Sequence, residues 1–220
     1  MRTVIFDLDG TLADTSADLI AAANHCFRGM GAGAMLDPVA DAATAFRGGR
    51  AMLRLGLGRI GAVDDAVIDR WYPELLRAYG DAICVETRLY PGAVEAVEAL
   101  RAKGMAVGIC TNKPEGLAVT LVERLGVAGL FASLVGADTL PVRKPDPTPF
   151  FEAVDRAGGA RSRSLLVGDT ETDRETARAA GVPSVLVGFG PEGPGVARMD
   201  PDAVIASYAE LPAVAARLLD

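Results

Sequence analysis

Short, continuous apolar runs recur along the chain and predict strands that are buried on both faces of a sheet. They span residues 4–6, 105–110, 164–167, 184–187 and 203–205. Apolar residues at helical spacing predict helices over 93–103, 117–125, 149–157 and 171–180, each followed directly by a glycine. Strands that alternate with helices in this way indicate a parallel sheet with right-handed crossovers. The predicted fold class is therefore α/β, with a Rossmann-like parallel sheet as its core.

One long segment, residues 16–86, interrupts the alternation because it contains no buried-strand pattern. Helical spacing predicts helices over 17–28 and 66–83, with shorter helices over 40–46 and 50–58. The strand pattern resumes after the Tyr-Pro-Gly turn at 90–92. We therefore expect a core domain formed by 1–15 and 87–220, with a small all-helical cap domain, 16–86, inserted after the first strand.

Composition narrows the classes of partner. The chain has 220 residues and a net charge of -7, and this acidic balance argues against a nucleic-acid partner held by general electrostatics. Its three cysteines are too few for a disulfide framework, and no apolar stretch is long enough for a signal peptide or a membrane helix. These features predict a cytoplasmic protein without membrane or nucleic-acid partners. The oligomeric state, monomer or homodimer, stays open.

Polar side chains follow three of the predicted strands, and ligands of open parallel sheets bind outside the carboxyl ends of the strands. A further cation stands in a loop before Pro145. The candidate residues are Asp7, Asp9, Thr111, Asn112, Lys144, Asp169 and Asp173. Several carboxylates with a hydroxyl and an ammonium group suit a phosphate ester together with Mg²⁺, which prefers oxygen ligands and bridges to phosphate oxygens.

Four short motifs resemble those of the haloacid dehalogenase superfamily, in the same order. They are Asp-Leu-Asp-Gly-Thr-Leu at 7–12, Thr-Asn-Lys-Pro at 111–114, Lys144 before Pro-Asp-Pro, and Gly-Asp at 168–169 followed by Asp173. The order and approximate spacing match across the whole core, and the helical insertion sits where this family commonly carries its cap domain. Four motifs in order make a coincidental match far less plausible than one motif would.

The resemblance implies a role for each residue. Asp7 would be the nucleophile that attacks phosphorus, and Asp9 would protonate the leaving alcohol and then activate water. Thr111 and Lys144 would bind the phosphoryl group, with Asn112 contacting the substrate. The implied Mg²⁺ site consists of Asp7, Asp9 through its backbone carbonyl, Asp169, and Asp173 as a supporting residue. The reaction would be hydrolysis of a small phosphate monoester through an aspartyl-phosphate.

Several activities within this family can be weighed against the residues. Asp9 argues against a dehalogenase, and the absence of lysine from 16–86 argues against a phosphonate hydrolase that uses a cap lysine. A sugar-phosphate phosphatase or a β-phosphoglucomutase-like phosphotransferase stays open, as does a catalytically silent binding module. The segment Gly-Ala-Asp-Thr-Leu-Pro at 136–141, before Arg143 and Lys144, is similar to bacterial phosphoglycolate phosphatases. The resemblance thus favours 2-phosphoglycolate as substrate.

Four further charged residues need an interpretation. Arg47 and Arg50 flank a glycine pair, and we hypothesise that they bind the distal carboxylate of the substrate; the alternative is that both are solvated. Asp18 is expected on a helix surface. Lys113 is expected to be exposed near the start of a helix.

Overall fold

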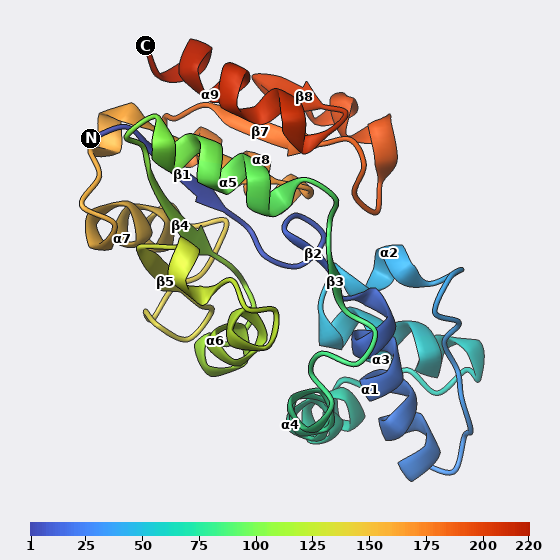
Figure 1. Ribbon diagram of the computed structural model, residues 1–220. Helices are drawn as coiled ribbons and strands as arrows, with labels where there is room; N and C mark the ends of the chain where they lie inside the picture. The colour runs from blue at the N-terminus through green and yellow to red at the C-terminus, as the bar shows by residue number, and fades with distance from the viewer. The chain divides into compact units, whose positions relative to one another are not determined.

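The computed structural model describes residues 1–220, and the chain divides into two compact units. One unit combines Met1–Ala13 with Leu89–Asp220, and the other is Asp14–Arg88. Two short strands, β2 (Ala13–Asp14) and β3 (Arg88–Leu89), pair with each other where the chain passes from one unit to the next. Figure 1 shows the first unit as a sheet flanked by helices and the second as helices alone. That the second unit acts as a cap stays a prediction.

A six-stranded sheet forms the centre of the first unit, and all of its strands run parallel. Their spatial order is β5-β4-β1-β6-β7-β8, which places the N-terminal strand in the interior of the sheet. The strands are β1 (Thr3–Phe6), β4 (Ala106–Cys110), β5 (Ser133–Val135), β6 (Ser164–Gly168), β7 (Ser184–Val187) and β8 (Ala203–Ile205). The predicted α/β parallel sheet is thus confirmed, and all five predicted strands are present.

Helices cover both faces of this sheet (Figure 1). Helices α5 and α9 contact each other and pack on one face, whereas α7 and α8 contact each other and pack on the other. Helix α6 packs beside β5. The helices of this unit are α5 (Ala93–Ala102), α6 (Glu115–Arg124), α7 (Thr148–Arg156), α8 (Glu171–Ala180) and α9 (Leu211–Leu219). The sequence pattern revealed neither the three-residue strand β5 nor helix α9.

The core on the α7 and α8 side explains why the strands are apolar throughout. Ile5 of β1 and Leu166 of β6 are completely buried against Phe150 and Val154 of α7. Because the other face of each strand is covered as well, β1, β4 and β6 have no solvent-facing positions, and every residue in them is buried. Packing on both faces fixes the ends of these strands and so positions the residues that directly follow them.

The second unit consists of four helices that pack on one another: α1 (Ser16–Gly29), α2 (Ala42–Ala45), α3 (Gly49–Arg59) and α4 (Asp65–Asp81). Gly56 of α3 lets two helices approach closely, since a Cβ there would lie 2.1 Å from the ring of Phe27 in α1. None of the helices in the chain combines the length and apolarity that crossing a bilayer requires.

The expectation that Asp18 is a helix-surface charge was wrong. Its side chain is buried, and its carboxylate accepts hydrogen bonds from the backbone N–H groups of Val85, Glu86 and Thr87 at 2.9–3.1 Å and from the Thr87 hydroxyl at 2.7 Å. Asp18 therefore ties α1 to the segment that ends this unit. Its partners lie far downstream, and a local sequence pattern cannot reveal them.

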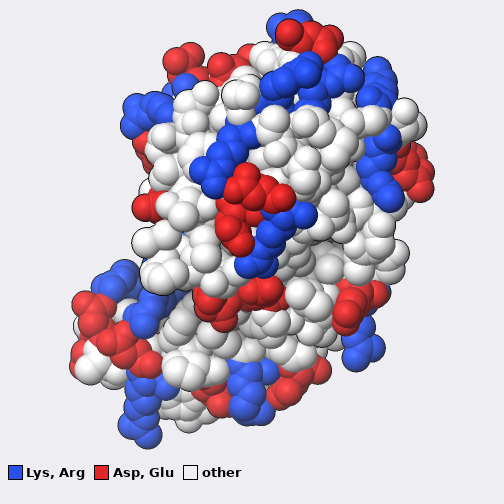
Figure 2. Space-filling view, turned by 90° about the vertical axis from the view of Figure 1, so that its left-hand side faces the viewer, with Lys and Arg blue, Asp and Glu red and all other residues white.

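Charges of both signs are mixed on the molecular surface. On the face shown in Figure 2, Lys and Arg side chains lie next to Asp and Glu side chains, and neither sign forms an extended patch. Ion pairs at the surface of the molecule include Arg77 with Glu74 and Arg161 with Asp155. Such pairs contribute little to stability individually.

Candidate active site

Three adjacent strands bring the predicted functional residues to one edge of the sheet. The register pairs Phe6 at the end of β1 with Ile109 of β4 on one side and with Val167 of β6 on the other. The residues that follow these strands, Asp7 and Thr111 among them, therefore emerge side by side at the carboxyl edge. The strand order also reverses direction at β1, and ligands of such sheets bind at this reversal.

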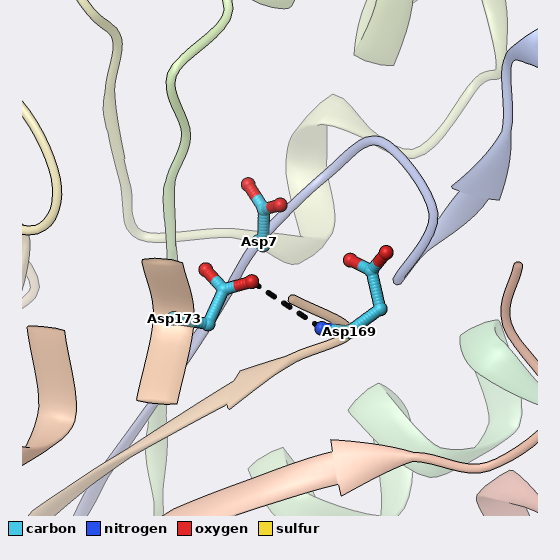
Figure 3. Close-up of side chains that lie close together, drawn as sticks. All are labelled: Asp7, Asp169 and Asp173. Atoms are coloured by element: carbon cyan, nitrogen blue, oxygen red, sulfur yellow. Dashed lines mark hydrogen bonds between the residues drawn. The ribbon is translucent and has the colours of Figure 1, made fainter. Parts of the chain in front are cut away.

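Three carboxylates meet at that edge. Asp7 follows β1, Asp169 follows β6, and Asp173 lies in the first turn of α8 (Figure 3). Their closest oxygen atoms all lie within 4.8 Å of one another, and all three residues are buried. Like charges this close repel strongly in a low-dielectric interior, so cations must compensate them.

Lys144 supplies one compensating charge. Its Nζ lies 2.6 Å from Oδ1 of Asp173 and 3.0 Å from Oδ1 of Asp7, and its side chain is 2% exposed. Burial alone would lower the pKa of this lysine, but the two carboxylates outweigh burial and raise the pKa above its ordinary value. The ammonium group is therefore charged at neutral pH.

Asp173 is fully engaged by other protein groups. Its Oδ1 pairs with Lys144, while Oδ2 accepts from the Thr170 hydroxyl at 2.7 Å and from the N–H groups of Thr170 and Asp169 at 3.1 and 3.3 Å. The approach depends on Gly168, because a Cβ there would lie 2.3 Å from Cβ and Cγ of Asp173. Asp173 thus locks the turn that carries Asp169.

Asp169 differs, because only one of its oxygens is used. Oδ1 accepts a hydrogen bond from the Thr11 hydroxyl at 2.8 Å, whereas the buried Oδ2 has no hydrogen-bond partner. Thr11 is itself held by Tyr208, whose buried hydroxyl donates to the Thr11 carbonyl at 2.7 Å. This buried Oδ2 therefore has an unused acceptor position.

The site carries more negative than positive charge. Burial, offset in part by Lys144, raises the pKa of Asp7 to about 6. Burial, followed by the charges of Asp173 and Asp7, raises the pKa of Asp169 well above its usual range. With every group ionised, four carboxylates exceed two ammonium groups by two charges; the groups are Asp7, Asp9, Asp169, Asp173, Lys113 and Lys144. The donor atoms are all oxygens, they carry two excess negative charges, and one carboxylate oxygen has no partner. These properties fit a divalent cation such as Mg²⁺.

Asp9 lies in the tight turn after Asp7 and pairs with an unexpected partner. Gly10 has a φ of 83°, a left-handed conformation that glycine adopts without strain, and it turns the chain back at this point. The Nζ of Lys113 lies 2.6 Å from Oδ1 of Asp9, and the two side chains are 4% and 17% exposed. The prediction that Lys113 is exposed was therefore wrong: it is a second buried cation at the site.

The residues after β4 shape the loops around the site. The Thr111 side chain is buried, and its hydroxyl accepts a hydrogen bond from the N–H of Lys113 at 3.2 Å. Asn112 is exposed, and its side-chain amide donates to the carbonyl of Lys144 at 3.0 Å. Asn112 therefore connects the loop after β4 to the loop that carries Lys144. Its predicted contact with substrate stays a prediction.

The two arginines that the sequence suggested for carboxylate recognition lie in the second unit, and both are exposed. The guanidinium of Arg50 forms an ion pair with Asp69 and lies 4.8 Å from the centre of the Tyr72 ring. Arg47 lines an open hollow of about 450 Å³ on the same unit. Their role in substrate recognition stays a prediction.

Comparison with known proteins identifies the family. The model of the haloacid dehalogenase-like hydrolases matches residues 1–181. The chain belongs to the haloacid dehalogenase-like hydrolase family. It is 40% identical over 211 residues to a phosphoglycolate phosphatase of Mesorhizobium japonicum, covering 93% of this chain and 90% of that protein. The predictions of a hydrolase of this family, most similar to phosphoglycolate phosphatases, and of an enzyme of the phosphoric monoester hydrolase type are confirmed.

Solved structures of this hydrolase family share the fold. A protein from Haemophilus somnus, described as a predicted phosphoglycolate phosphatase, superposes with a TM-score of 0.84 at 24% identity, covering 97% of each chain. A provisionally assigned β-phosphoglucomutase from Thermotoga maritima superposes with a TM-score of 0.72 at 22% identity over the full length of both. Because one fold carries both kinds of name, the fold alone does not distinguish hydrolysis from phosphoryl transfer.

The structure of this hydrolase therefore brings Asp7, Asp9, Lys144, Asp169 and Asp173 together, and the buried Thr111 follows the neighbouring strand β4. Sequence reasoning missed three further residues of the site: Thr11, Lys113 and Tyr208. One signal pointed to Lys113, since the chain uses Arg for nearly all of its 22 basic residues and has only three lysines. Two of these three lie within motifs.

Proposed function

We propose that this hydrolase is a Mg²⁺-dependent phosphatase that acts on small phosphate monoesters, with 2-phosphoglycolate as its preferred substrate. The supporting observation is the cluster of Asp7, Asp169 and Lys144, in which a carboxylate, an unpartnered carboxylate oxygen and an ammonium group share one buried edge. The substrate rests on similarity to phosphoglycolate phosphatases over nearly the whole chain.

The first half of the reaction uses Asp7 as nucleophile. A carboxylate oxygen of Asp7 attacks phosphorus, the bond from phosphorus to the ester oxygen breaks, and Asp9 gives its proton to the departing alkoxide. The product alcohol leaves, and the phosphoryl group stays on Asp7 as an acyl phosphate. Dividing hydrolysis into two displacements replaces one difficult step with two easier ones.

The second half regenerates the enzyme. Asp9 takes a proton from a water molecule, the water oxygen attacks phosphorus, and the acyl phosphate bond breaks to release phosphate and the Asp7 carboxylate. Proton transfer by a positioned side chain is worth about 10²–10⁴ in rate. The position of Asp9 in the turn immediately after Asp7 supports this assignment of both proton transfers to one residue.

Lys144 and Thr111 bind the phosphoryl group in this proposal. The Lys144 ammonium offsets the charge of Asp7, so that the nucleophile can approach an anionic phosphate. Mg²⁺, held by Asp7, the Asp9 carbonyl and Asp169, would supply Lewis-acid charge to the phosphate oxygens. Asp173 would support this set through its hydrogen bonds to the Asp169 turn, rather than through a free oxygen.

The test is phosphate release from a panel of monoesters that includes 2-phosphoglycolate, sugar phosphates and nucleotides, with Mg²⁺ and with EDTA. We expect the highest kcat/KM for 2-phosphoglycolate, loss of turnover in EDTA, and recovery on addition of Mg²⁺. Full activity in EDTA would show that the reaction does not need a divalent metal ion. Conversion of β-glucose 1-phosphate to the 6-phosphate without phosphate release would indicate the phosphotransferase instead.

A further inference from the structure

The ion pair between Lys113 and Asp9 lies at the candidate active site but has no role in the proposed reaction. The Nζ of Lys113 is 2.6 Å from Oδ1 of Asp9, and the lysine side chain is 4% exposed. A buried ammonium group has already lost its water during folding, so it can exchange one carboxylate partner for another without a further desolvation penalty on its own side.

The backbone of Lys113 is fixed at both ends. Its N–H donates to the Thr111 hydroxyl at 3.2 Å, and its carbonyl accepts from the N–H of Ala137 at 2.9 Å. The loop after β4 and the loop after β5 are thus joined at this lysine. A cation with a fixed backbone can bind an anion with less loss of conformational entropy than a lysine on a mobile loop.

Residues of the second loop complete this arrangement. The carboxylate of Asp138 accepts from the N–H of Glu115 at 2.7 Å and so caps the start of α6. Gly136 permits the contact between the loops, because a Cβ there would lie 2.5 Å from the backbone N and Cα of Glu115. The Gly-Ala-Asp-Thr segment at 136–139 therefore stabilises the turn that carries Lys113.

We propose that Lys113 is a specificity-determining residue that binds a second anionic group of the substrate, a carboxylate beyond the phosphate. This inference rests on the proposed function, since it takes Asp9 as the residue that reaches the leaving oxygen. Because the Nζ of Lys113 lies 2.6 Å from Oδ1 of Asp9, the ammonium group stands beside the residue that must turn toward that oxygen. A carboxylate one carbon beyond the ester oxygen would therefore lie near this ammonium group.

Binding would exchange one ion pair for another. When the substrate carboxylate pairs with Lys113, the side chain of Asp9 is released from the lysine, accepts a proton from the solvent and can turn toward the leaving oxygen. A monoester without a second anion leaves the Lys113–Asp9 pair intact, and Asp9 is then held away from the reaction. The same cation thus favours the anionic substrate in binding and disfavours neutral analogues in the chemical step.

The experiment compares two substrates that differ only at this position: 2-phosphoglycolate and 2-hydroxyethyl phosphate, which has a neutral alcohol in place of the carboxylate. The measured quantity is the ratio of their kcat/KM values. In Lys113→Met we expect this ratio to fall by about 10- to 100-fold, the range for loss of one hydrogen bond to a charged group. Lys113→Arg should retain most of the preference, because it keeps the charge.

Lys103→Met is the matched control, since Lys103 is exposed and lies at the end of α5. It should leave the ratio unchanged. A ratio that is unchanged in Lys113→Met, or that falls equally in Lys103→Met, would overturn the inference. If Lys113→Met does not fold, equal kcat/KM values of the unmodified enzyme for the two substrates would overturn it as well.

The two proposals fail in different ways. Without release of phosphate from any monoester in the presence of Mg²⁺, the proposed function is wrong. Phosphate release with no preference for 2-phosphoglycolate over 2-hydroxyethyl phosphate would leave a phosphatase, but the role of Lys113 would be wrong.

Discussion

The ammonium group of Lys144 lies 2.6 Å from the carboxylate of Asp173, and the two side chains are 2% and 1% exposed. The other oxygen of Asp173 binds the turn that carries Asp169. Lys144 is therefore both a cation of the site and a structural support for it. Removing one partner of a buried pair leaves an uncompensated charge, which is far more harmful than losing an exposed pair.

Replacing Lys144 with Met should lower both stability and turnover. We expect the free energy of unfolding at neutral pH to fall by about 3–5 kcal/mol, because Asp173 and Asp7 lose their cation. Phosphate release should fall by at least about 10²–10³-fold. Chemical denaturation and steady-state kinetics measure the two effects. Lys103→Met, at an exposed position, should change stability by less than about 0.5 kcal/mol, and an equally small effect for Lys144→Met would contradict the account.

The pKa of Asp7 should make the stability of the metal-free protein depend on pH. Burial raises this pKa from 3.8 to about 6, so the native state keeps its proton at pH values where the unfolded chain has lost it. The contribution of Asp7 to stability is thus present below pH 4 and is lost as the pH rises through 6. In EDTA, Asp7→Asn should be more stable than the unmodified protein above pH 6, by roughly 1–3 kcal/mol.

Denaturation curves at several pH values between 4 and 8, in EDTA, measure this difference. The stabilities of the two proteins should converge toward pH 4, where the carboxyl group of Asp7 is protonated and resembles the amide. Parallel curves across the whole range would show that Asp7 ionises as easily in the folded protein as in the unfolded chain.

Mg²⁺ should stabilise the folded protein through Asp169. A cation that binds only the native state raises stability by RT ln(1 + [Mg²⁺]/Kd), which is about 2.7 kcal/mol at a hundredfold excess over Kd. Thermal denaturation should therefore show a Tm that rises with Mg²⁺ concentration. Asp169→Asn should weaken the response, while Asp155→Asn, at an exposed carboxylate, should retain it. An Mg²⁺-dependent Tm of normal size in Asp169→Asn would place the cation elsewhere.

A substitution at Gly168 tests whether Asp173 must lie close to the turn that carries Asp169. In Gly168→Ala the new Cβ would lie 2.3 Å from the side chain of Asp173, so the first turn of α8 must move away. We expect a loss of about 1–3 kcal/mol in stability, with reduced Mg²⁺ affinity. Gly116→Ala is the control, because a Cβ there meets no atom within 4 Å and alanine favours the helix by about 1 kcal/mol. Equal stability of the two variants would contradict the steric argument.

Much of the core fold could be predicted from the sequence because the signals are local. The apolar runs around Ile5 and Leu166 reveal strands that are buried on both faces, and each carries its polar residue directly after it. Strand β5 was missed because three residues form no recognisable run. Helix α9 was missed because no prediction extended beyond residue 205.

The errors at Asp18 and Lys113 have a common physical cause. Each was expected to be exposed because charged residues near helix starts usually are. Each is buried because its partner comes from a distant part of the chain: Thr87 for Asp18, and Asp9 for Lys113. Pairing across such separations is a property of the folded chain, and neither composition nor spacing reports it.

The central claim is that Asp7 accepts the phosphoryl group, and acid quenching during turnover tests it most directly. With p-nitrophenyl phosphate, whose leaving group departs without a proton, Asp9→Asn should accumulate the intermediate, because it lacks the base that activates water. Mass spectrometry of the quenched protein should then find one phosphoryl group on the peptide that contains Asp7, removable by hydroxylamine, and none in Asp7→Asn. Continued phosphate release by Asp7→Asn, or a phosphoryl group on any other residue, would contradict the account.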